Sequence, residues 1–532
     1  MTDKSPMRSS VSPPCNRTAS LWIALLLALP PGLRPVAAQS AYEELQTFSA
    51  VLNHIRLNYA DSVSYHELVH AAIDGMLRSL DPHSYFLSRA DWERRSAFER
   101  GELAGVGILL EAEDSAATVV SVLPESPADK AGVQPGDRIA EVNDTSVAGL
   151  KAEEVALRLA GPKGAKVRIR LERGVRLEPE TLRVTLKRNF LKPPPVVVTG
   201  MADSVTGYLK LVWFGPKAGE EVHDALKSLR RQGARQVILD LRNNPGGVVD
   251  AAVEIASEFL LKGTVVFREK GRKKDANQDF VTKRDGDSRD LPLVLLINGR
   301  SASASEALAG SLQDHDRALI LGRRSFGKAL VQTGFVVLPG GDVVELTIAR
   351  VFTPSGRVIQ RRYKGIGYQQ YWSFAGKSGA EEDTLAVYRT DHGREVRGGG
   401  GIEPDVPLPA PAALPVWWSV ATDSGFDVTV ADSVAQTLTA TPAGRAQWLT
   451  GRARWSQGVL APFLTRVRAR LHVVAQPDSL LAERIALLLA ARAATVRWPP
   501  DGGDELLLRN DPDIRAAVGY FPRLAERLSG PK

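Results

Sequence analysis

The chain has 532 residues, of which 44% are hydrophobic and 24% are charged, and its formal net charge is +7 at pH 7. This composition is typical of globular proteins and excludes a disordered or fibrous chain, and the length suffices for three or four domains. Because the positive excess is small for so long a chain, the charge does not predict a nucleic-acid-binding protein.

Residues 1–38 have the three parts of a secretory signal. Arg8 and Arg17 precede the apolar stretch Leu21–Leu29, and the small residues Val36-Ala37-Ala38 precede Gln39. The apolar stretch is too short to span a bilayer, which needs about 20 residues. We therefore expect cleavage before Gln39 and export to the bacterial periplasm or the outer face of the inner membrane. An uncleaved membrane anchor is the alternative.

The single cysteine of the chain, Cys15, precedes the apolar stretch and would leave with the signal. The mature chain would then have no thiol. This prediction excludes disulfide bonds, catalysis by a thiolate and metal sites built from cysteine.

Residues 39–100 form a predicted helical N-terminal region. Apolar residues recur at helical spacing from Leu45 to Ile55 and again from Leu68 to Leu80. The second helix ends at Leu80-Asp81-Pro82-His83-Ser84, where the proline cannot continue it. Because no second histidine or carboxylate at ligand spacing accompanies His83, we interpret it as a structural turn residue and expect no metal site.

Residues 101–190 change to short alternating strands between glycine-rich turns. The expected strands are Ile108–Leu110, Thr118–Val122, Val167–Leu171 and Leu182–Leu186. Three local patterns occur here in a fixed order: the loop Gly105-Val106-Gly107-Ile108, a short helix in Ser126–Gly132 and a turn in Gln134–Ile139. Together they resemble a PDZ domain.

The resemblance to PDZ domains implies peptide binding. In that family the amides of the glycine-rich loop bind the C-terminal carboxylate of a peptide, and the peptide adds a strand to the sheet edge. The next segment, Leu150–Leu159, would be the helix that lines the groove. Val155 and Leu159 are candidate peptide contacts, but a hydrophobic core would use the same residues, so the sequence leaves both roles open.

Residues 191–406 alternate strands and helices, which predicts an α/β domain. The expected elements are strands Gly207–Leu211, Val237–Leu241 and Leu293–Ile297 and helices Ala218–Gln232 and Val249–Leu261. Between a strand and a helix lies the turn Asp240–Gly247. The amides of Gly246 and Gly247 there could bind an oxyanion, or the glycines could serve only a tight connection.

The run Ser301–Glu306 follows the strand that ends at Ile297 and opens a segment with helical spacing. A serine at such a junction is exposed to substrate. The amides of Ser303 and Ala304 would lie at the helix N-terminus, where partial positive charge stabilises an oxyanion. The arrangement suits acyl transfer.

Two familiar catalytic arrangements fit this serine run poorly. The closest histidine, His315, is expected about three turns along the same helix, which makes it a poor base for Ser303. The segment Ser325–Lys328 matches the Ser-x-x-Lys pattern of penicillin-binding proteins, but its internal glycine opposes a helix and no Lys-Thr-Gly follows.

A dyad of Ser303 with Lys328 fits better. A lysine has an ordinary pKa of about 10.4, and burial can lower it by roughly 3 units, which makes the free amine available as a base. The apolar residues Phe326, Leu330 and Val331 flank the lysine. Gln332, four positions later, offers a neutral acceptor that can orient the amine without restoring its charge.

The whole set of motifs resembles the carboxyl-terminal processing peptidases, also called tail-specific proteases, over about residues 41–406. The motifs are Leu80–Ser84, the PDZ-like segment, Asp240–Gly247, Ser301–Glu306, Gln313–Ala318, Phe326–Lys328, Val331-Gln332, Thr353–Arg357 and Ile402–Asp405. The resemblance implies that Ser303 is the nucleophile, Lys328 the base and Gln332 its orienting partner. It also implies oxyanion donors at Ala304 and Gly247, with Gly246 as the alternative.

One position departs from the family. Ala329 follows the lysine where a second glycine is usual, and an alanine there would be costly if the backbone had a positive φ. After the proline-rich segment from Pro404 to Pro415, the remaining chain has helical spacing at Ala461–His472 and Ser479–Thr495. Residues 407–532 are therefore predicted to be a linker and a helical C-terminal region.

The expected protein is an α/β multidomain chain with a helical N-terminal region, a PDZ-like β domain, an α/β serine protease core and a helical C-terminal tail. We expect an exported serine endopeptidase that binds the C-terminus of protein substrates, needs no cofactor and has an adaptor protein or a second copy of itself as a further partner. The alternatives are a catalytically silent PDZ adaptor and a penicillin-recognising acyl-transfer enzyme that uses Ser325.

Overall fold

A computed structural model describes residues 41–529 except 101–102, 114–115, 124–125, 135–136, 151, 174–179, 192, 338–339, 373–385 and 500–501. The predicted signal and part of the predicted turn Gln134–Ile139 lie outside the described residues. The chain divides into two units, the first ending at Met76 and the second running from Leu77.

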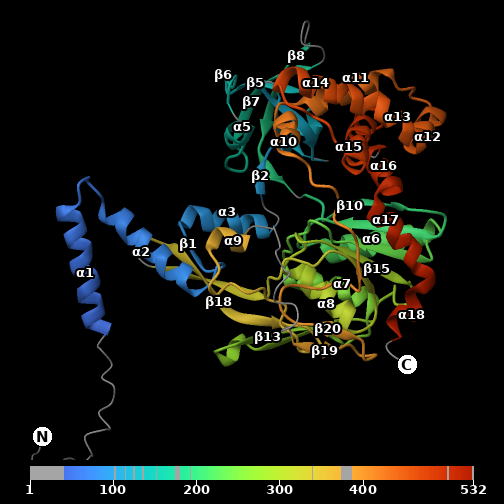
Figure 1. The fold of residues 1–532 in the computed structure, drawn as a ribbon. Coiled ribbons are helices and arrows are strands. Elements are labelled where there is room, and N and C mark those ends of the chain that lie inside the picture. Colours follow the sequence, from blue (N-terminus) through green and yellow to red (C-terminus); the bar gives the residue numbers. More distant parts are fainter. Residues whose placement is uncertain are drawn as a thin grey trace, which may run out of the picture. The chain divides into compact units, whose positions relative to one another are not determined.

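The first unit consists of helix α1 (Ala41–Asn58) and most of α2 (Tyr65–Leu80), as the apolar spacing predicts (Figure 1). Glutamates lie in the first turn of α1 and an arginine in its last turn, where they complement the helix dipole. Within the described part of the chain no helix has the length and hydropathy needed to cross a bilayer.

The segment after α2 joins the protease core. Strand β1 (Tyr85–Leu87) pairs antiparallel with β18 (Asp342–Phe352), and helix α3 (Arg89–Glu99) follows it. The predicted boundary at residue 100 therefore does not separate two independent regions. The predicted N-terminal region supplies a strand of a core sheet. Three residues are too few to show a strand pattern, and the partner strand lies more than 250 positions away.

The PDZ-like domain has a sheet in the order β3-β4-β5-β7-β8, with β6 paired to β5. Its strands are β3 (Ile108–Glu113), β4 (Ala116–Val122), β5 (Arg138–Val142), β6 (Thr145–Ser146), β7 (Lys166–Arg173) and β8 (Glu180–Lys187). Two helices, α4 (Pro127–Lys130) and α5 (Ala152–Leu159), accompany it, and β2 (Leu103–Gly105) pairs with β9 (Asn189–Leu191). All four predicted strands are confirmed.

The protease core contains a six-stranded sheet in the order β10-β11-β12-β15-β16-β21. Every neighbouring pair is parallel except β10 with β11. The strands are β10 (Val196–Met201), β11 (Thr206–Leu211), β12 (Gln236–Asp240), β15 (Leu293–Ile297), β16 (Leu319–Gly322) and β21 (Val406–Pro407). The carboxyl ends of parallel strands share one edge, where catalytic loops of such sheets lie.

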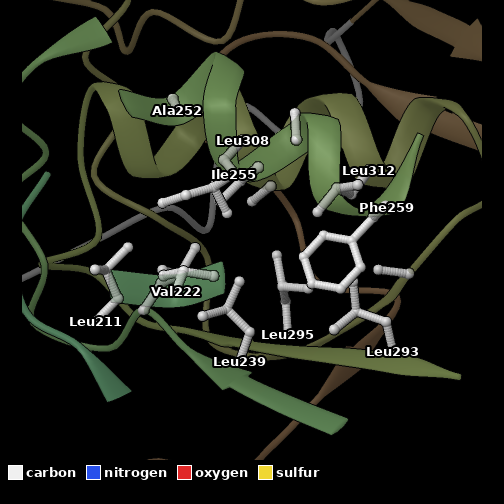
Figure 2. Packing of buried hydrophobic residues seen from close by; sticks show 14 of the residues in the cluster. Leu211, Val222, Leu239, Ala252, Ile255, Phe259, Leu293, Leu295, Leu308 and Leu312 are labelled. Atoms are coloured by element: carbon white, nitrogen blue, oxygen red, sulfur yellow. The ribbon is translucent and has the colours of Figure 1, made fainter. Parts of the chain in front are cut away.

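One face of this sheet packs on helices α6 (Ala218–Arg231), α7 (Val249–Phe259) and α8 (Ala304–Asp314). Figure 2 shows side chains of the sheet, such as Leu239 and Leu295, facing Ile255, Phe259 and Leu308 from the helices. These side chains are almost completely buried. Near-continuous apolar strands are expected in a parallel sheet covered on both faces, and β15 reads Leu-Val-Leu-Leu-Ile.

A second core sheet contains β1, β18, β13 (Val265–Gly271) and β14 (Gln278–Val281), with β17 (Leu330–Val337) paired to β18. Of the sequence motifs, Thr353–Arg357 follows β18 and forms a turn, in which the amide of Gly356 donates to the carbonyl of Thr353 at 2.9 Å.

The C-terminal region is helical, as predicted, and has a hydrophobic core of its own around Trp448, Trp455 and Phe463. Helices α14 (Ala461–Leu471) and α15 (Ser479–Arg497) correspond to the two predicted segments. The structure adds α10 (Val416–Asp423), α11 (Phe426–Thr437), α12 (Pro442–Thr450), α13 (Arg452–Trp455), α16 (Gly502–Asn510), α17 (Pro512–Tyr520) and α18 (Leu524–Leu528).

Candidate active site

Ser303 lies at the N-cap of α8, after the turn that leaves the carboxyl end of β15. Its backbone has φ 58° and ψ −116°, a conformation that non-glycine residues rarely adopt. Such strain costs about 1–3 kcal/mol and persists where the surroundings enforce it, often at functional sites. The side chain is only partly buried, so the sharp turn presents the serine at the sheet edge.

The two neighbouring serines of the run are buried and structural. The hydroxyl of Ser301 donates to the carbonyl of Leu241 at 2.7 Å, and that of Ser305 donates to the carbonyl of Asn244 at 2.9 Å. Both bonds fasten the start of α8 to the loop after β12. Of the three serines, Ser303 is therefore the one whose hydroxyl is available for chemistry.

The carboxylate of Glu306 joins the serine turn to the lysine turn. One oxygen, Oε2, accepts the backbone amides of Ser303 at 2.9 Å and Lys328 at 2.8 Å. The other, Oε1, accepts the amide of Gly327 at 2.7 Å and the hydroxyl of Ser325. The side chain is only 1% exposed. Burial raises the pKa of Glu306 to about 7, although the four donors favour the ionised form.

Lys328 is partly buried and lies two residues before β17. Of the three apolar residues expected to flank the lysine, Phe326 and Leu330 are buried and Val331 is partly buried. Ala329 does not have a positive φ, so the backbone strain that an alanine could cause in place of glycine is absent at this position. Its amide donates to Oε1 of Gln360 at 2.8 Å, and its methyl group is buried in the core.

The Leu80–Ser84 turn lies close to the lysine. Oδ1 of Asp81 accepts the amides of His83 at 2.8 Å and Ser84 at 2.9 Å, which closes the turn that follows α2. His83 is buried and its Nε2 lies 2.7 Å from the hydroxyl of Tyr371. Burial, and then the positive charge of Lys328, lowers the pKa of His83 to about 4. The imidazole therefore stays neutral beside the lysine.

Gln332 lies on β17 and bonds to the neighbouring strand. Its Nε2 donates to the hydroxyl of Thr347 at 3.2 Å, and the amide of Thr347 donates to the hydroxyl of Ser84 at 3.2 Å. With Nε2 as the donor in this contact, the Oε1 atom remains as an acceptor.

The loop between β12 and α7 packs directly against Ser303. A Cβ atom on Gly246 would lie 2.8 Å from the Cβ atom of Ser303 and 2.7 Å from the carbonyl oxygen of Ala302. The Gly246 amide is buried and donates to Oδ1 of Asn244 at 2.9 Å. Gly247 is exposed, and in the described part of the chain neither its amide nor that of Ala304 donates a hydrogen bond.

The side chains of the alternative mechanisms are engaged in other hydrogen bonds. His315 is at the opposite end of α8, an 11-residue helix that is about 16 Å long, and it bonds to Asp391 and to the carbonyl of Val265. Ser325 is buried, and its hydroxyl bonds to Glu306 while it accepts the amide of Ile402 at 2.6 Å. Neither residue is placed to act on a substrate at Ser303.

Three of the sequence motifs meet at the far end of α8. The buried guanidinium of Arg357 bonds to Oε1 of Gln313 at 2.7 Å and to Oδ1 of Asp314 at 2.6 Å. Arg394 bonds to Asp316 and Asp405, each at 2.5 Å. The segments Gln313–Ala318, Thr353–Arg357 and Ile402–Asp405 therefore form a scaffold that anchors the helix carrying Ser303.

In the PDZ-like domain the loop Val106-Gly107 connects β2 to β3, and β3 is an edge strand of its sheet. Gly107 has φ 85°, and a Cβ atom there would lie 2.2 Å from the Cβ atom of Ser126. Gly105 and Ile108 are the ends of the flanking strands. Val155 and Leu159 are buried in the core of this domain, as expected if they are core residues.

Glu306 is the functional residue whose role the sequence analysis missed. The pattern Ser303-x-x-Glu306 is that of a capping box, in which the glutamate bonds to the amide of the N-cap residue. This signal predicts the bond to Ser303. The bonds to Gly327 and Lys328 come from a segment about 20 positions away and follow no local pattern.

Two known families match the sequence, the PDZ domain at residues 118–173 and peptidase family S41 at residues 205–370. The carboxy-terminal-processing protease of Bartonella bacilliformis is 35% identical over 336 residues, which cover 62% of this chain and 74% of the relative. The carboxyl-terminal-processing protease of Synechocystis sp. is 36% identical over 56% of this chain and 69% of the relative.

Carboxy-terminal processing protease CtpA of Bacillus subtilis is 30% identical over 61% of this chain and 69% of the relative. Among solved structures, the chain is similar to the photosystem II D1 C-terminal processing protease, with 27% identity, a TM-score of 0.37 and coverage of 71% of this chain and 89% of that one. It is also similar to the PDZ domain of the carboxy-terminal protease from Vibrio cholerae in complex with a peptide, with 27% identity, a TM-score of 0.16 and coverage of 16% and 94%.

Proposed function

The chain belongs to the carboxy-terminal processing proteases of peptidase family S41, and on this premise we propose that it cleaves protein substrates with Ser303 as the nucleophile and Lys328 as the base. The observation that carries this proposal is the shared carboxylate of Glu306. Its Oε2 atom accepts the amides of both residues, so two segments far apart in sequence are neighbours at the sheet edge.

Lys328 must lose its proton before it can act as a base. Two groups near the lysine support a neutral amine: Phe326, two positions away, is buried, and His83, whose pKa the charge of Lys328 helps to lower, is neutral. Gln332 offers its carbonyl oxygen as a neutral acceptor that orients the amine. A carboxylate in that place would instead stabilise the ammonium form.

In the proposed reaction the amine of Lys328 takes the hydroxyl proton of Ser303 while Oγ attacks the scissile carbonyl carbon. The carbonyl oxygen becomes an oxyanion that accepts the amides of Ala304 and Gly247. We favour Gly247 over Gly246 because the Gly246 amide already donates to Asn244. The lysine then returns its proton to the leaving amine, and water hydrolyses the acyl-enzyme.

Substrate capture belongs to the PDZ domain in this proposal. The loop Gly105–Ile108 would bind the substrate's C-terminal carboxylate, and the peptide would add a strand beside β3, the edge strand of the sheet. The first 38 residues support export of the enzyme, and the mature protein should then begin at Gln39 when its N-terminus is sequenced.

The test is digestion of an unfolded protein by wild type, Ser303→Ala, Lys328→Ala and Lys328→Arg, with products identified by mass spectrometry. Arginine keeps the positive charge but does not deprotonate near neutral pH, so Lys328→Arg should be as inactive as Lys328→Ala. The matched controls Ser433→Ala and Lys262→Ala, at exposed positions, should cleave like wild type. Equal cleavage by wild type and all three active-site variants would refute the dyad.

A further inference from the structure

The last helices of the chain cover the second face of the protease sheet. Leu508 of α16, Ile514 of α17 and Phe521 pack with Tyr208, Leu296 and Leu321 of the strands in one buried cluster. Figure 1 shows α17 and α18, in red, alongside the core. The C-terminal region is thus packed onto the strands whose carboxyl ends carry the active-site loops.

Two carboxylates at the start of α17 bind arginines from the strand ends. Asp511 is the N-cap of the helix, and its Oδ1 accepts the amides of Asp513 at 2.8 Å and Ile514 at 3.2 Å. Nη1 of Arg242 donates to Asp511 at 3.1 Å and to Asp513 at 2.9 Å. Asp513 also binds Arg323, whose Nη2 lies 3.0 Å from Oδ1. One helix turn therefore connects the ends of β12 and β16.

Arg242 is held from inside the core as well. Asp240 is fully buried and accepts the backbone amide of Arg242 at 2.8 Å and its Nε at 3.0 Å, while the hydroxyl of Tyr208 donates to the same carboxylate at 2.7 Å. Burial opposes the ionisation of Asp240, but Arg242 keeps the pKa of this carboxyl below its usual range. The guanidinium thus lies between a carboxylate of the strand and two of α17.

Arg242 is the first residue of the loop that packs on the nucleophile. The next residue, Asn243, has φ 62° and its amide donates to Asn298 at 3.0 Å. The carbonyl of Asn244 accepts the amide of Ala302 at 3.0 Å and the hydroxyl of Ser305 at 2.9 Å. A shift of Arg242 would therefore also move Gly246 and Gly247, a few residues later in the same loop. It would move the turn of Ser303 as well, because that turn bonds to the loop.

We propose that Asp511 and Asp513 are positioning residues that fix the Arg242–Gly247 loop, and that the C-terminal helices are an integral part of the catalytic unit. The inference rests on the proposed role of that loop at the oxyanion. In this proposal the C-terminal region aligns the reacting groups, whereas the PDZ domain binds the substrate.

The test uses the full-length chain and a quenched fluorescent peptide with a free C-terminal carboxylate. Asp513→Asn removes one charge from the cluster, and Asp511→Asn removes another while asparagine still caps the helix. Each should lower kcat at least tenfold with little change in KM, because small misplacements of catalytic groups cost that much. Asp513→Glu should restore much of the rate. Arg445→Gln is the control, since it breaks an ion pair with Glu505 inside the same helical region.

Thermal unfolding of each variant separates loss of fold from loss of alignment. If Asp513→Asn does not fold, the kcat of folded Asp511→Asn tests the proposal. Wild-type kcat in a folded charge variant would overturn the proposal, and so would an equal fall in kcat for Arg445→Gln. Failure of the proposed function looks different, because wild type itself would then not cleave the peptide or would match Ser303→Ala.

Discussion

At the scale of single residues, the site depends on one buried carboxylate and one strained serine. Glu306 accepts four hydrogen bonds and binds both the Ser303 and the Lys328 turn. Such a group is costly to bury, and its four donors offset part of that cost. The charge state of Glu306 should therefore influence the stability of the protein.

We predict a pH-dependent difference in stability between wild type and Glu306→Gln. The folded-state pKa of Glu306, about 7, lies above the ordinary 4.5, so the protonated carboxyl favours folding and this contribution is lost as pH rises through 7. Relative to the variant, wild type should lose roughly 3 kcal/mol of unfolding free energy between about pH 4 and pH 8. Urea unfolding over a pH series measures this; parallel curves would contradict it.

Gly246 offers a second test at the residue scale. An alanine Cβ there would lie within 3 Å of Ser303 and of the Ala302 carbonyl, at φ 99°, and would displace Ser303, the proposed nucleophile. Gly246→Ala should lower kcat about 100-fold or more in the peptide assay. Gly365→Ala is the control, because Gly365 also has a positive φ but no heavy atom lies within 4 Å of its added Cβ. Equal losses in both variants would show that backbone strain alone is responsible.

At the scale of elements, the edge strand β3 and the loop before it make the proposed substrate-capture site. An edge strand has unpaired backbone groups on one side, and a peptide can pair with them. The described contacts also explain why residue 107 is a glycine. Its loop packs so closely on Ser126 that a side chain would not fit. The geometry of the loop therefore depends on a contact between two turns of the domain.

Peptide binding to the Ser303→Ala protein should depend on the terminal carboxylate. We expect amidation of the peptide's C-terminus to weaken binding at least tenfold in fluorescence anisotropy, because the proposed loop binds the charged group. Gly107→Ala should weaken binding of the free peptide to a similar degree. Acetylation of the N-terminus is the matched control and should have no effect. Unchanged binding after amidation would refute the proposal that this loop binds the terminal carboxylate.

At the scale of the whole molecule, the protease sheet is a layer covered on both faces. Helices α6, α7 and α8 cover one face, and the helices after residue 502 cover the other. A parallel sheet requires cover on both faces because its strands are apolar on both. The C-terminal helices are therefore expected to contribute to the stability of the core.

We predict that Ile514→Ala lowers the unfolding free energy by about 2–5 kcal/mol, the usual cost of truncating a buried isoleucine. Ile514 is 3% exposed and packs with strand residues in one cluster. Val416→Ala, at an 82% exposed position in the same region, should change it by no more than about 0.5 kcal/mol. Thermal and urea unfolding measure both, and similar effects would mean that α17 adds little to the core.

The amino-acid sequence by itself determined the local elements and the candidate residues. Hydrophobic periodicity placed the strands of the PDZ-like domain, the apolar strand Leu293–Ile297 and the helices of the core, because each needs only neighbouring residues to specify it. The order of short motifs singled out Ser303 and Lys328 as candidate residues and identified the family. The reason is that nucleophile turns and glycine loops require particular residue types at fixed local spacing.

Only the tertiary structure decided which distant segments meet. It brought Glu306 to the lysine turn, His83 to Tyr371, β1 to β18, and Arg242 to Asp511 and Asp513. Contacts of this kind join residues tens to hundreds of positions apart, and they form because burial of apolar faces sets the packing first. A hydrogen bond between such residues leaves no periodic trace in the sequence, so its partners become visible only once the chain is folded.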